Sequence, residues 1–203
     1  SSDVCSSDLA EFMKDQNDGV WNHRRFPSLS DSKVGIVGFG SIGKEIAKKL
    51  SVFDVEVTAF TQSGRDGSLK VEELDKHLPN LDIVILILPL TDSSRHMFDA
   101  ARLSKMKDGA LLINMARGPV VVTDALVAEL QTKRLFAALD VTDPEPLPDG
   151  HSLWGAPNLI ITPHTADTPE MCIRLLSQRI LENTAKQIAR VPLVGQVNLK
   201  LGY

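Results

Sequence analysis

The sequence lacks several features that point to particular classes of protein. Its 203 residues include only two cysteines, Cys5 and Cys172, so it has neither a disulfide framework nor the cysteine spacing of a metal site. Its longest apolar run, 83–90, contains Pro89 and is far shorter than the roughly 20 residues that a membrane span needs. We therefore expect no metal site, no membrane insertion and a reducing, cytoplasmic environment.

Positive charge is not in excess either. The formal net charge of -4 and the pI near 5.7 give no broad basic surface for nucleic acid or for an anionic membrane. With 43% hydrophobic residues, the chain is long enough to bury one substantial core. These properties favour a globular protein whose partner is a small molecule.

The first nine residues have no hydrophobic periodicity, no apolar signal segment and no initiating methionine. We interpret residues 1–9 as a non-native leader that replaces a lost N-terminal part. The polar stretch 10–33, with a few isolated aromatic residues, predicts a connector helix and a turn at Pro27 before the first strand.

Beyond residue 33, short apolar segments alternate with stretches of helical periodicity. The predicted strands are 34–37, 55–60, 83–88, 110–114, 136–141 and 159–162, and the predicted helices between them are 42–50, 71–78, 100–106 and 123–135, the last capped by Thr123 or Asp124. Strands that are apolar on both faces and alternate with helices predict an α/β fold with a doubly wound parallel sheet. Such a sheet binds ligands beyond the carboxyl ends of its strands.

A glycine motif follows the first predicted strand. Gly38 permits a tight turn, Gly40 lets a pyrophosphate approach the backbone, and Gly43 lets the helix and strand pack closely. The N-terminus of the helix then attracts the negative charge of the phosphates. Because the motif opens a series of alternating strands and helices, it predicts a Rossmann-type NAD(P)-binding domain.

The end of the second predicted strand bears on the choice of cofactor. An NAD-preferring site usually carries Asp or Glu there, to bind the ribose 2′-hydroxyl. This chain has Thr61, followed by Ser63 and Arg65, which suit a 2′-phosphate. NADP is therefore favoured over NAD, with the alternative that Arg65 is only solvated beside Asp66.

Three later loops carry side chains suited to hydride transfer. That reaction needs a cation to hold and polarise a 2-oxo acid, and a proton donor for its oxygen. Arg117 follows the fourth predicted strand and His164 follows the sixth, while a neighbouring carboxylate would stabilise a protonated imidazole. The pattern alone does not choose Glu145 over Asp143 or Asp149 as that carboxylate.

Several motifs together resemble the D-isomer-specific 2-hydroxyacid dehydrogenases, a family that includes glyoxylate/hydroxypyruvate reductases. The resemblance extends from about Trp21 to Asn198 and rests on the segments 38–43, 88–91, 114–118, 140–141, 145–148, 153–154 and 163–166. It implies an enzyme that moves a hydride between NAD(P)H and a small 2-oxo or D-2-hydroxy acid.

The resemblance also implies a role for each residue. Arg117 would bind and polarise the substrate, His164 would be the acid/base, and Glu145 would orient His164. The implied cofactor-binding residues are Gly38, Gly40, Ser41, Ile42, Gly43, Thr61, Ser63, Arg65, Leu88, Pro89, Ser94, Met115, Ala116 and Asp140. Thr61 departs from the family, which usually has Asp at this position.

The family's cofactor domain is inserted into a substrate domain, and this determines the expected domain plan. Residues 10–166 are expected to form the NAD(P)-binding domain with its connector helix, and 167–203 a C-terminal helix and tail that belong to a mostly missing substrate domain. The fragment alone would bind NADPH but turn over poorly. A homodimer is also implied.

Two other functions stay open at this stage. One is a phosphite dehydrogenase-like enzyme, because such enzymes share the Arg, Glu and His set. The other is a dinucleotide-sensing protein that resembles the corepressors of the family, which the presence of all three side chains does not exclude.

Overall fold

The computed structural model describes residues 8–23, 28–166 and 169–197 of the chain. The chain divides into two compact units, 1–163 and 164–203, and each is described here by itself. Residues 1–7 of the expected leader, the turn expected at Pro27 and the tail beyond residue 197 lie outside the described residues. No helix in the described part has the length and apolar character to cross a membrane.

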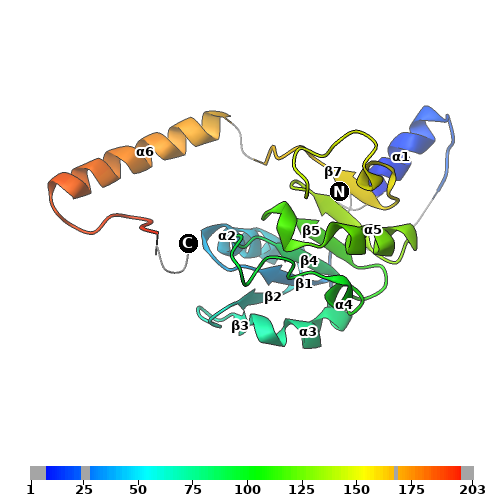
Figure 1. The fold of residues 1–203 in the computed structure, drawn as a ribbon, viewed down its shortest axis with the longest axis horizontal. Helices are drawn as coiled ribbons and strands as arrows, with labels where there is room; N and C mark the ends of the chain where they lie inside the picture. Colours follow the sequence, from blue (N-terminus) through cyan, green and yellow to red (C-terminus); the bar gives the residue numbers. More distant parts are fainter. Residues whose placement is uncertain (1–7, 24–27, 167–168, 198–203) are drawn as a thin grey trace. The chain divides into compact units, whose positions relative to one another are not determined.

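The described part of the first unit is built on one parallel sheet of seven strands, in the order β3-β2-β1-β4-β5-β6-β7 (Figure 1). The strands are β1 Lys33–Val37, β2 Glu56–Thr61, β3 Leu69–Lys70, β4 Ile83–Leu86, β5 Leu111–Asn114, β6 Phe136–Leu139 and β7 Leu159–Ile161. All six predicted strands are present, and the predicted α/β class is confirmed. The seventh strand, β3, was not predicted because two residues are too few to show a periodicity.

Helices and helical turns precede β1 or connect the strands. They are α1 Asp8–Asn17, α2 Ser41–Leu50, η2 Ser51–Phe53, η3 Val71–Glu73, α3 Leu74–His77, η4 Leu78–Asn80, α4 Ala100–Leu103, η5 Gly118–Val120, α5 Thr123–Gln131 and η6 Ser152–Gly155. The helix predicted at 71–78 is broken into three short turns, and α5 ends four residues before the predicted Leu135. Lys133, with a φ of 59°, takes the left-handed conformation that turns the chain toward β6.

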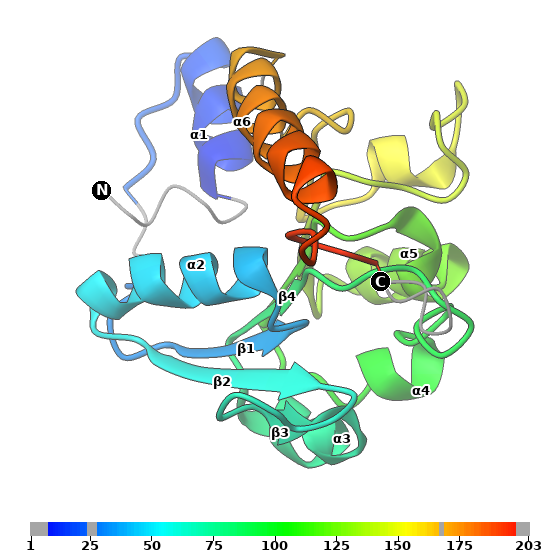
Figure 2. The same cartoon turned by 90° about the vertical axis from the view of Figure 1, so that its left-hand side faces the viewer.

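The sheet is covered on both faces. Figure 2 shows α2 over one face of β1 and β2, and α3 on the opposite side. On the α2 side, Ile46 and Leu50 pack against Val34, Ile36 and Ile85. The larger cluster contains Leu74 of α3, Leu103 of α4, and Leu126 and Leu130 of α5.

The strand register aligns the carboxyl ends of the strands. Paired residues form one row across the sheet, which consists of Leu69, Phe60, Val37, Leu86, Asn114, Leu139 and Ile161. The loops that follow these residues therefore leave the sheet at the same edge. This is the edge at which a doubly wound sheet binds its ligands.

The second unit contains the helix α6, Pro169–Ile188, which closely matches the helix predicted at this position. The Asn183 side chain donates to the carbonyl oxygen of Val194 at 3.1 Å and accepts from its backbone nitrogen at 2.9 Å. The segment after the helix is therefore held against α6 within this unit.

Candidate cofactor-binding site

The glycine turn after β1 is fitted closely to its neighbours. Gly38 has a φ of 104°, and a Cβ at this position would collide with the carbonyl oxygen of Ile87. Its backbone nitrogen donates to the carbonyl oxygen of Phe60 at 2.9 Å. Gly43 is buried, and a Cβ there would collide with the carbonyl oxygen of Gly38. Both positions require glycine because backbone atoms occupy the space of a side chain.

Gly40 has the opposite surroundings. A Cβ at Gly40 would meet no atom within 4 Å, so the space beside its Cα atom is open. Gly40 is the N-cap of α2 and no side chain caps the helix there, while Ser41 and Ile42 of the first turn are exposed. The first N–H groups of a ten-residue helix are thus available to an anion. These features fit the pyrophosphate of a dinucleotide.

Ile42 lies in the first turn of α2. Its side chain is 60% exposed. The first turn of α2 begins directly after the glycine turn, which follows the carboxyl end of β1. Ile42 therefore offers an apolar surface next to the open helix N-terminus.

The loop that begins with the last residue of β2, residues 61–68, is held by its own side chains. The Thr61 hydroxyl accepts from the Gly64 nitrogen at 2.9 Å and lies 2.8 Å from the Ser68 hydroxyl. Ser68 is buried and donates to the carbonyl oxygen of Arg65 at 2.6 Å. The Ser63 and Arg65 side chains are exposed on this loop. Thr61 therefore shapes the loop that presents them.

An ion pair connects the 61–68 loop with α2. The Lys44 ammonium lies 2.7 Å from a carboxylate oxygen of Asp66. The hydrogen bond and charge of Lys44, with a smaller effect of the Arg65 charge, lower the pKa of Asp66, although partial desolvation opposes them. Asp66 is therefore an anion at neutral pH.

The loop after β4 contains Leu88, Pro89 and Ser94. Pro89 is exposed and Leu88 is half-buried, while Ser94 is only 3% exposed. The Ser94 hydroxyl donates to the carbonyl oxygen of Pro89 at 2.7 Å and accepts from the Thr91 nitrogen at 2.7 Å. Ser94 thus fixes the turn that places Leu88 and Pro89 at the sheet edge.

The loop after β5, residues 115–118, carries Arg117. Asn114 is buried, and its side chain accepts from the Ala116 nitrogen at 3.0 Å and donates to the Arg117 carbonyl oxygen at 3.1 Å. Met115 is exposed and Ala116 is buried. The Arg117 side chain is exposed and donates to the Ala116 carbonyl oxygen at 2.6 Å. Asn114 therefore determines the backbone conformation from which Arg117 projects.

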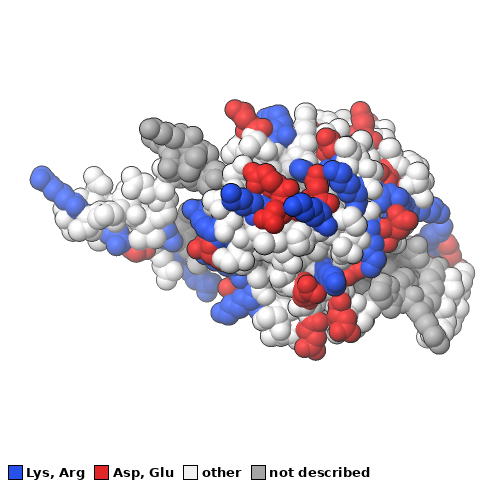
Figure 3. Space-filling model, turned by 90° about the horizontal axis from the view of Figure 1, so that it is seen from below, with Lys and Arg blue, Asp and Glu red and all other residues white. Residues whose placement is uncertain are grey.

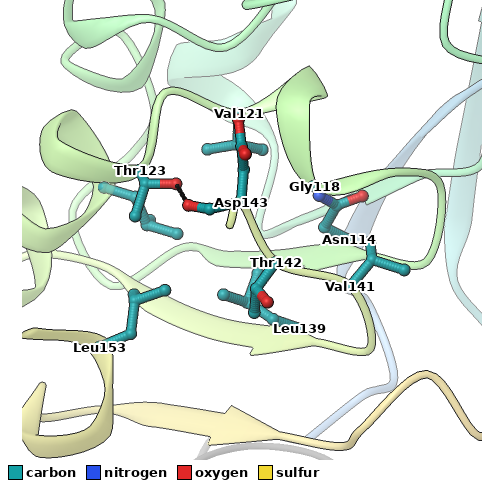
Figure 4. Close-up of a pocket in the computed structure, with 10 residues that line it drawn as sticks. Asn114, Gly118, Val121, Thr123, Leu139, Val141, Thr142, Asp143 and Leu153 are labelled. Atoms are coloured by element: carbon teal, nitrogen blue, oxygen red, sulfur yellow. Dashed lines mark hydrogen bonds between the residues drawn. The ribbon is translucent and has the colours of Figure 1, made fainter. Parts of the chain in front are cut away.

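The Arg117 loop packs against the segment that precedes Glu145. A Cβ on Gly118 would collide with the backbone of Thr142 and Asp143. Thr123 donates from its hydroxyl to the Asp143 carbonyl oxygen at 2.7 Å, as Figure 4 shows beside a small cavity. The predicted capping role of Thr123 or Asp124 is wrong, since Val122 is the N-cap of α5 and no side chain caps that helix. The Thr123 hydroxyl connects two loops instead.

Asp140 and Glu145 follow β6. Asp140 is 8% exposed, and the Thr162 hydroxyl donates to its carboxylate at 2.5 Å. The Asp140 nitrogen donates to the Asn114 carbonyl oxygen at 3.0 Å. Glu145 is exposed, three residues beyond the close contact of Thr142 with Gly118. Arg117, Asp140 and Glu145 thus lie on two loops in direct contact.

His164 is the first residue of the second unit, exposed and with a φ of 52°. Its predicted approach to Arg117 and Glu145 spans the two units and stays a prediction. His151, which belongs to the first unit, has a structural role, because its Nδ1 atom accepts from the Leu153 nitrogen at 3.2 Å and caps η6.

Comparison with known proteins identifies the family. Residues 4–166 match the family described as D-isomer specific 2-hydroxyacid dehydrogenase, NAD binding domain. The chain belongs to this family. The resemblance inferred from the sequence motifs is therefore confirmed.

Three similar proteins illustrate the relationship. Glycerate dehydrogenase of Methylorubrum extorquens is 36% identical over 185 residues, which are 86% of this chain and 58% of that protein. A D-isomer specific 2-hydroxyacid dehydrogenase of Xanthobacter autotrophicus Py2, in complex with NADPH and MES, has 32% identity and a TM-score of 0.88, with 98% of this chain and 84% of that chain covered. An NADPH-dependent glyoxylate/hydroxypyruvate reductase of Sinorhizobium meliloti, in complex with NADP and sulfate, has 28% identity and a TM-score of 0.89, with 98% and 66% covered.

The chain thus spans 58% of the length of the curated glycerate dehydrogenase that it matches.

Some contributors to the site were not predicted from the sequence. Thr123, Gly118 and Lys44 act through residues that are distant along the chain or through the backbone. The one sequence signal for any of them is the glycine that directly follows Arg117.

Proposed function

We propose that the chain is the cofactor-binding part of a dehydrogenase that moves a hydride between NADP(H), or NAD(H), and a small 2-oxo or D-2-hydroxy acid. Glyoxylate and hydroxypyruvate are the proposed substrates, in line with the names of the relatives. The observation that carries the proposal is the glycine turn opening α2 at the same sheet edge as the Arg117 loop. Family membership supports it.

The cofactor site consists of the backbone of the glycine turn, the exposed Ser41 and Ile42, and loops after four strands. We assign Thr61, Ser63 and Arg65 to the adenosine ribose, and Leu88, Pro89, Met115 and Ala116 to the remaining walls. Ser94 contributes by fixing the Pro89 turn, because its hydroxyl is already bound to that residue. NADP is preferred, since the 61–68 loop offers a guanidinium and hydroxyls to a phosphate.

When bound, the nicotinamide cofactor supplies or accepts the hydride. The exposed Arg117 guanidinium holds the substrate carboxylate and polarises its carbonyl group, because a fixed cation stabilises the negative charge that develops on oxygen. His164 donates the proton to this oxygen, and Glu145 stabilises the protonated imidazole. Asp140, whose carboxylate is held by Thr162, contacts the nicotinamide end.

A longer protein completes this site in the proposal. Residues 167–203 would return to a substrate domain whose other part precedes the chain, and that domain would close over the cleft and exclude water. The 203-residue chain is accordingly expected to bind NADPH and to turn over poorly. A homodimer in the cytoplasm belongs to the same proposal, and sedimentation of the longer protein tests the oligomeric state.

The test measures NADPH oxidation with glyoxylate and with hydroxypyruvate, each assayed separately. With phosphite it measures the reduction of NADP instead. The chain and a version extended upstream by the residues that its gene encodes are compared. His164→Ala in the extended protein should lower kcat at least about a hundredfold and leave the Kd for NADPH nearly unchanged. His151→Ala is the matched control, because the contact of His151 is the cap of η6. Equal losses from both variants would refute the assignment of His164.

A further inference from the structure

A surface ion pair connects the helix whose N-terminus is assigned to the pyrophosphate with the loop that the proposed function assigns to the adenosine ribose. Lys44 lies in the first turn of α2, just after the glycine turn, and Asp66 lies in the 61–68 loop, 22 residues further along. The ammonium and the carboxylate are 2.7 Å apart, and their side chains are 49% and 50% exposed. The pair is therefore accessible from solvent at the place where the ribose is expected.

Charge in this region is locally unbalanced. Asp66 is the only carboxylate among residues 61–68, and it is acted on by both Lys44 and Arg65. Two cations thus share one anion. Figure 3 shows Lys and Arg interspersed with Asp and Glu on the face that it presents, without a broad patch of one sign. Such an arrangement favours one additional small anion.

The ion pair is not what holds the loop in place. The Thr61 hydroxyl contacts Gly64 and Ser68, and buried Ser68 contacts the Arg65 carbonyl, all within the loop itself. An exposed ion pair contributes little to stability and exchanges partners at low cost. Lys44 is therefore able to leave Asp66 without loss of the loop conformation.

We propose that the 2′-phosphate of NADPH displaces Asp66 from Lys44, so that Lys44 selects for NADPH and Asp66 competes with the phosphate for it. This inference rests on the proposed function, because it requires that the chain binds a dinucleotide in this orientation. A phosphate carries more charge than a carboxylate and three acceptor oxygens, and so it outcompetes Asp66. NADH has a hydroxyl group at this position and leaves the Lys44–Asp66 pair intact.

The test is equilibrium binding of NADPH and NADH to the whole 203-residue chain and to single variants. Lys44→Met should weaken NADPH binding about tenfold, through loss of a charge-assisted hydrogen bond, and change NADH binding less than about twofold. Asp66→Asn should strengthen NADPH binding about threefold, because the competing charge is gone. Lys44→Arg should keep the preference for NADPH.

Lys49→Met provides the matched control. Lys49 lies on the same helix, is exposed and pairs with Glu45 at 3.2 Å, so this variant removes an equal charge without touching the 61–68 loop. It should leave the ratio of the two affinities unchanged. Adenosine 2′,5′-bisphosphate and adenosine 5′-phosphate, used as small probes, should repeat the pattern of NADPH and NADH.

The inference predicts opposite effects of the two main variants on NADPH binding: Lys44→Met weakens it and Asp66→Asn strengthens it. If Lys44→Met and Asp66→Asn both weaken NADPH binding, the pair only supports the loop and the inference is overturned. Equal effects of Lys44→Met on NADPH and NADH would overturn it as well. A chain that binds both cofactors but shows no effect of either variant refutes this inference alone, whereas a chain that binds neither cofactor refutes the proposed function and this inference with it.

Discussion

The 61–68 loop and the Arg117 loop are held in different ways. In the 61–68 loop, Thr61 contacts residues three and seven positions further along the chain. Beside the Arg117 loop, Thr123 bonds Asp143 across 20 residues and Thr162 bonds Asp140 across 22. The first loop is thus shaped by neighbours in sequence, and the second depends on strands already aligned. We expect substitutions in the second region to affect the whole domain and those in the first to act locally.

Gly118→Ala should have the largest effect. The new Cβ would collide with the Thr142 and Asp143 backbone, which has no flexible side chain to move aside. We expect a loss of about 3 kcal/mol in the free energy of unfolding, which is at the upper end of the typical cost of an overpacked core substitution. Urea denaturation followed by circular dichroism measures this loss.

Gly155→Ala is the matched control, because a Cβ there would meet no atom within 4 Å. It should change the unfolding free energy by less than about 0.5 kcal/mol. A similar loss in both variants would show that the Arg117 loop and the 142–143 segment are not packed as closely as the structure indicates. The contrast between the Arg117 loop and the 61–68 loop would then lose its support.

Thr123→Val should have an intermediate effect. It keeps the shape of the side chain but leaves the Asp143 carbonyl without its hydroxyl donor, at a cost of about 1 kcal/mol in stability. Because this bond positions the segment before Glu145, kcat of the extended protein should fall while the Kd for NADPH stays the same. Steady-state kinetics and NADPH titration separate the two effects.

Thr132→Val tests the same kind of hydroxyl contact at the other end of α5. The Thr132 hydroxyl donates to the Glu129 carbonyl oxygen, three residues before it, at 2.8 Å. This variant should leave kcat unchanged. An equal fall in kcat for both threonine variants would contradict a special role for the long-range bond.

Thr61→Val should have the smallest effect on global stability, below about 1 kcal/mol, since only a local loop loses its contacts. NADPH binding should nevertheless weaken about fivefold, because the loop must be ordered when the cofactor binds. Thr61→Ser keeps the hydroxyl and should restore binding. Calorimetric titration of both variants provides the measurement, and an unfolding loss as large as that of Gly118→Ala would erase the distinction between the loops.

Much of the architecture was predictable because its signals are local. The alternating apolar segments predicted six strands, and the glycine motif predicted the turn into α2. Strand β3 and the breaks in the helix at 71–78 were not predicted, since two-residue pairing and 3-10 turns leave no periodicity. The extent of α5 was overestimated for a similar reason: Leu135 continues the apolar pattern although the helix has already ended.

In the candidate site, the side chains were easier to predict than the contacts that hold them. Arg117 and His164 were predicted as side chains that follow strands, whereas Asp140 and the choice of Glu145 came from the family resemblance. The register places Arg117 and Asp140 on loops leaving one edge. Nothing in the sequence indicates that Thr123 would bond Asp143, or that Lys44 would bond Asp66. These contacts join segments 20 and 22 residues apart, whose distance is decided only by folding.

The sequence by itself determined the family, the sheet and the glycine turn, because each depends on residue types at fixed short spacings. Only the tertiary structure decided which hydroxyls connect loops, which carboxylate faces Lys44, and why Gly118 has no room for a side chain. The physical reason is that backbone and side-chain atoms from distant segments compete for the same space, and their arrangement follows from the packed sheet rather than from local preference.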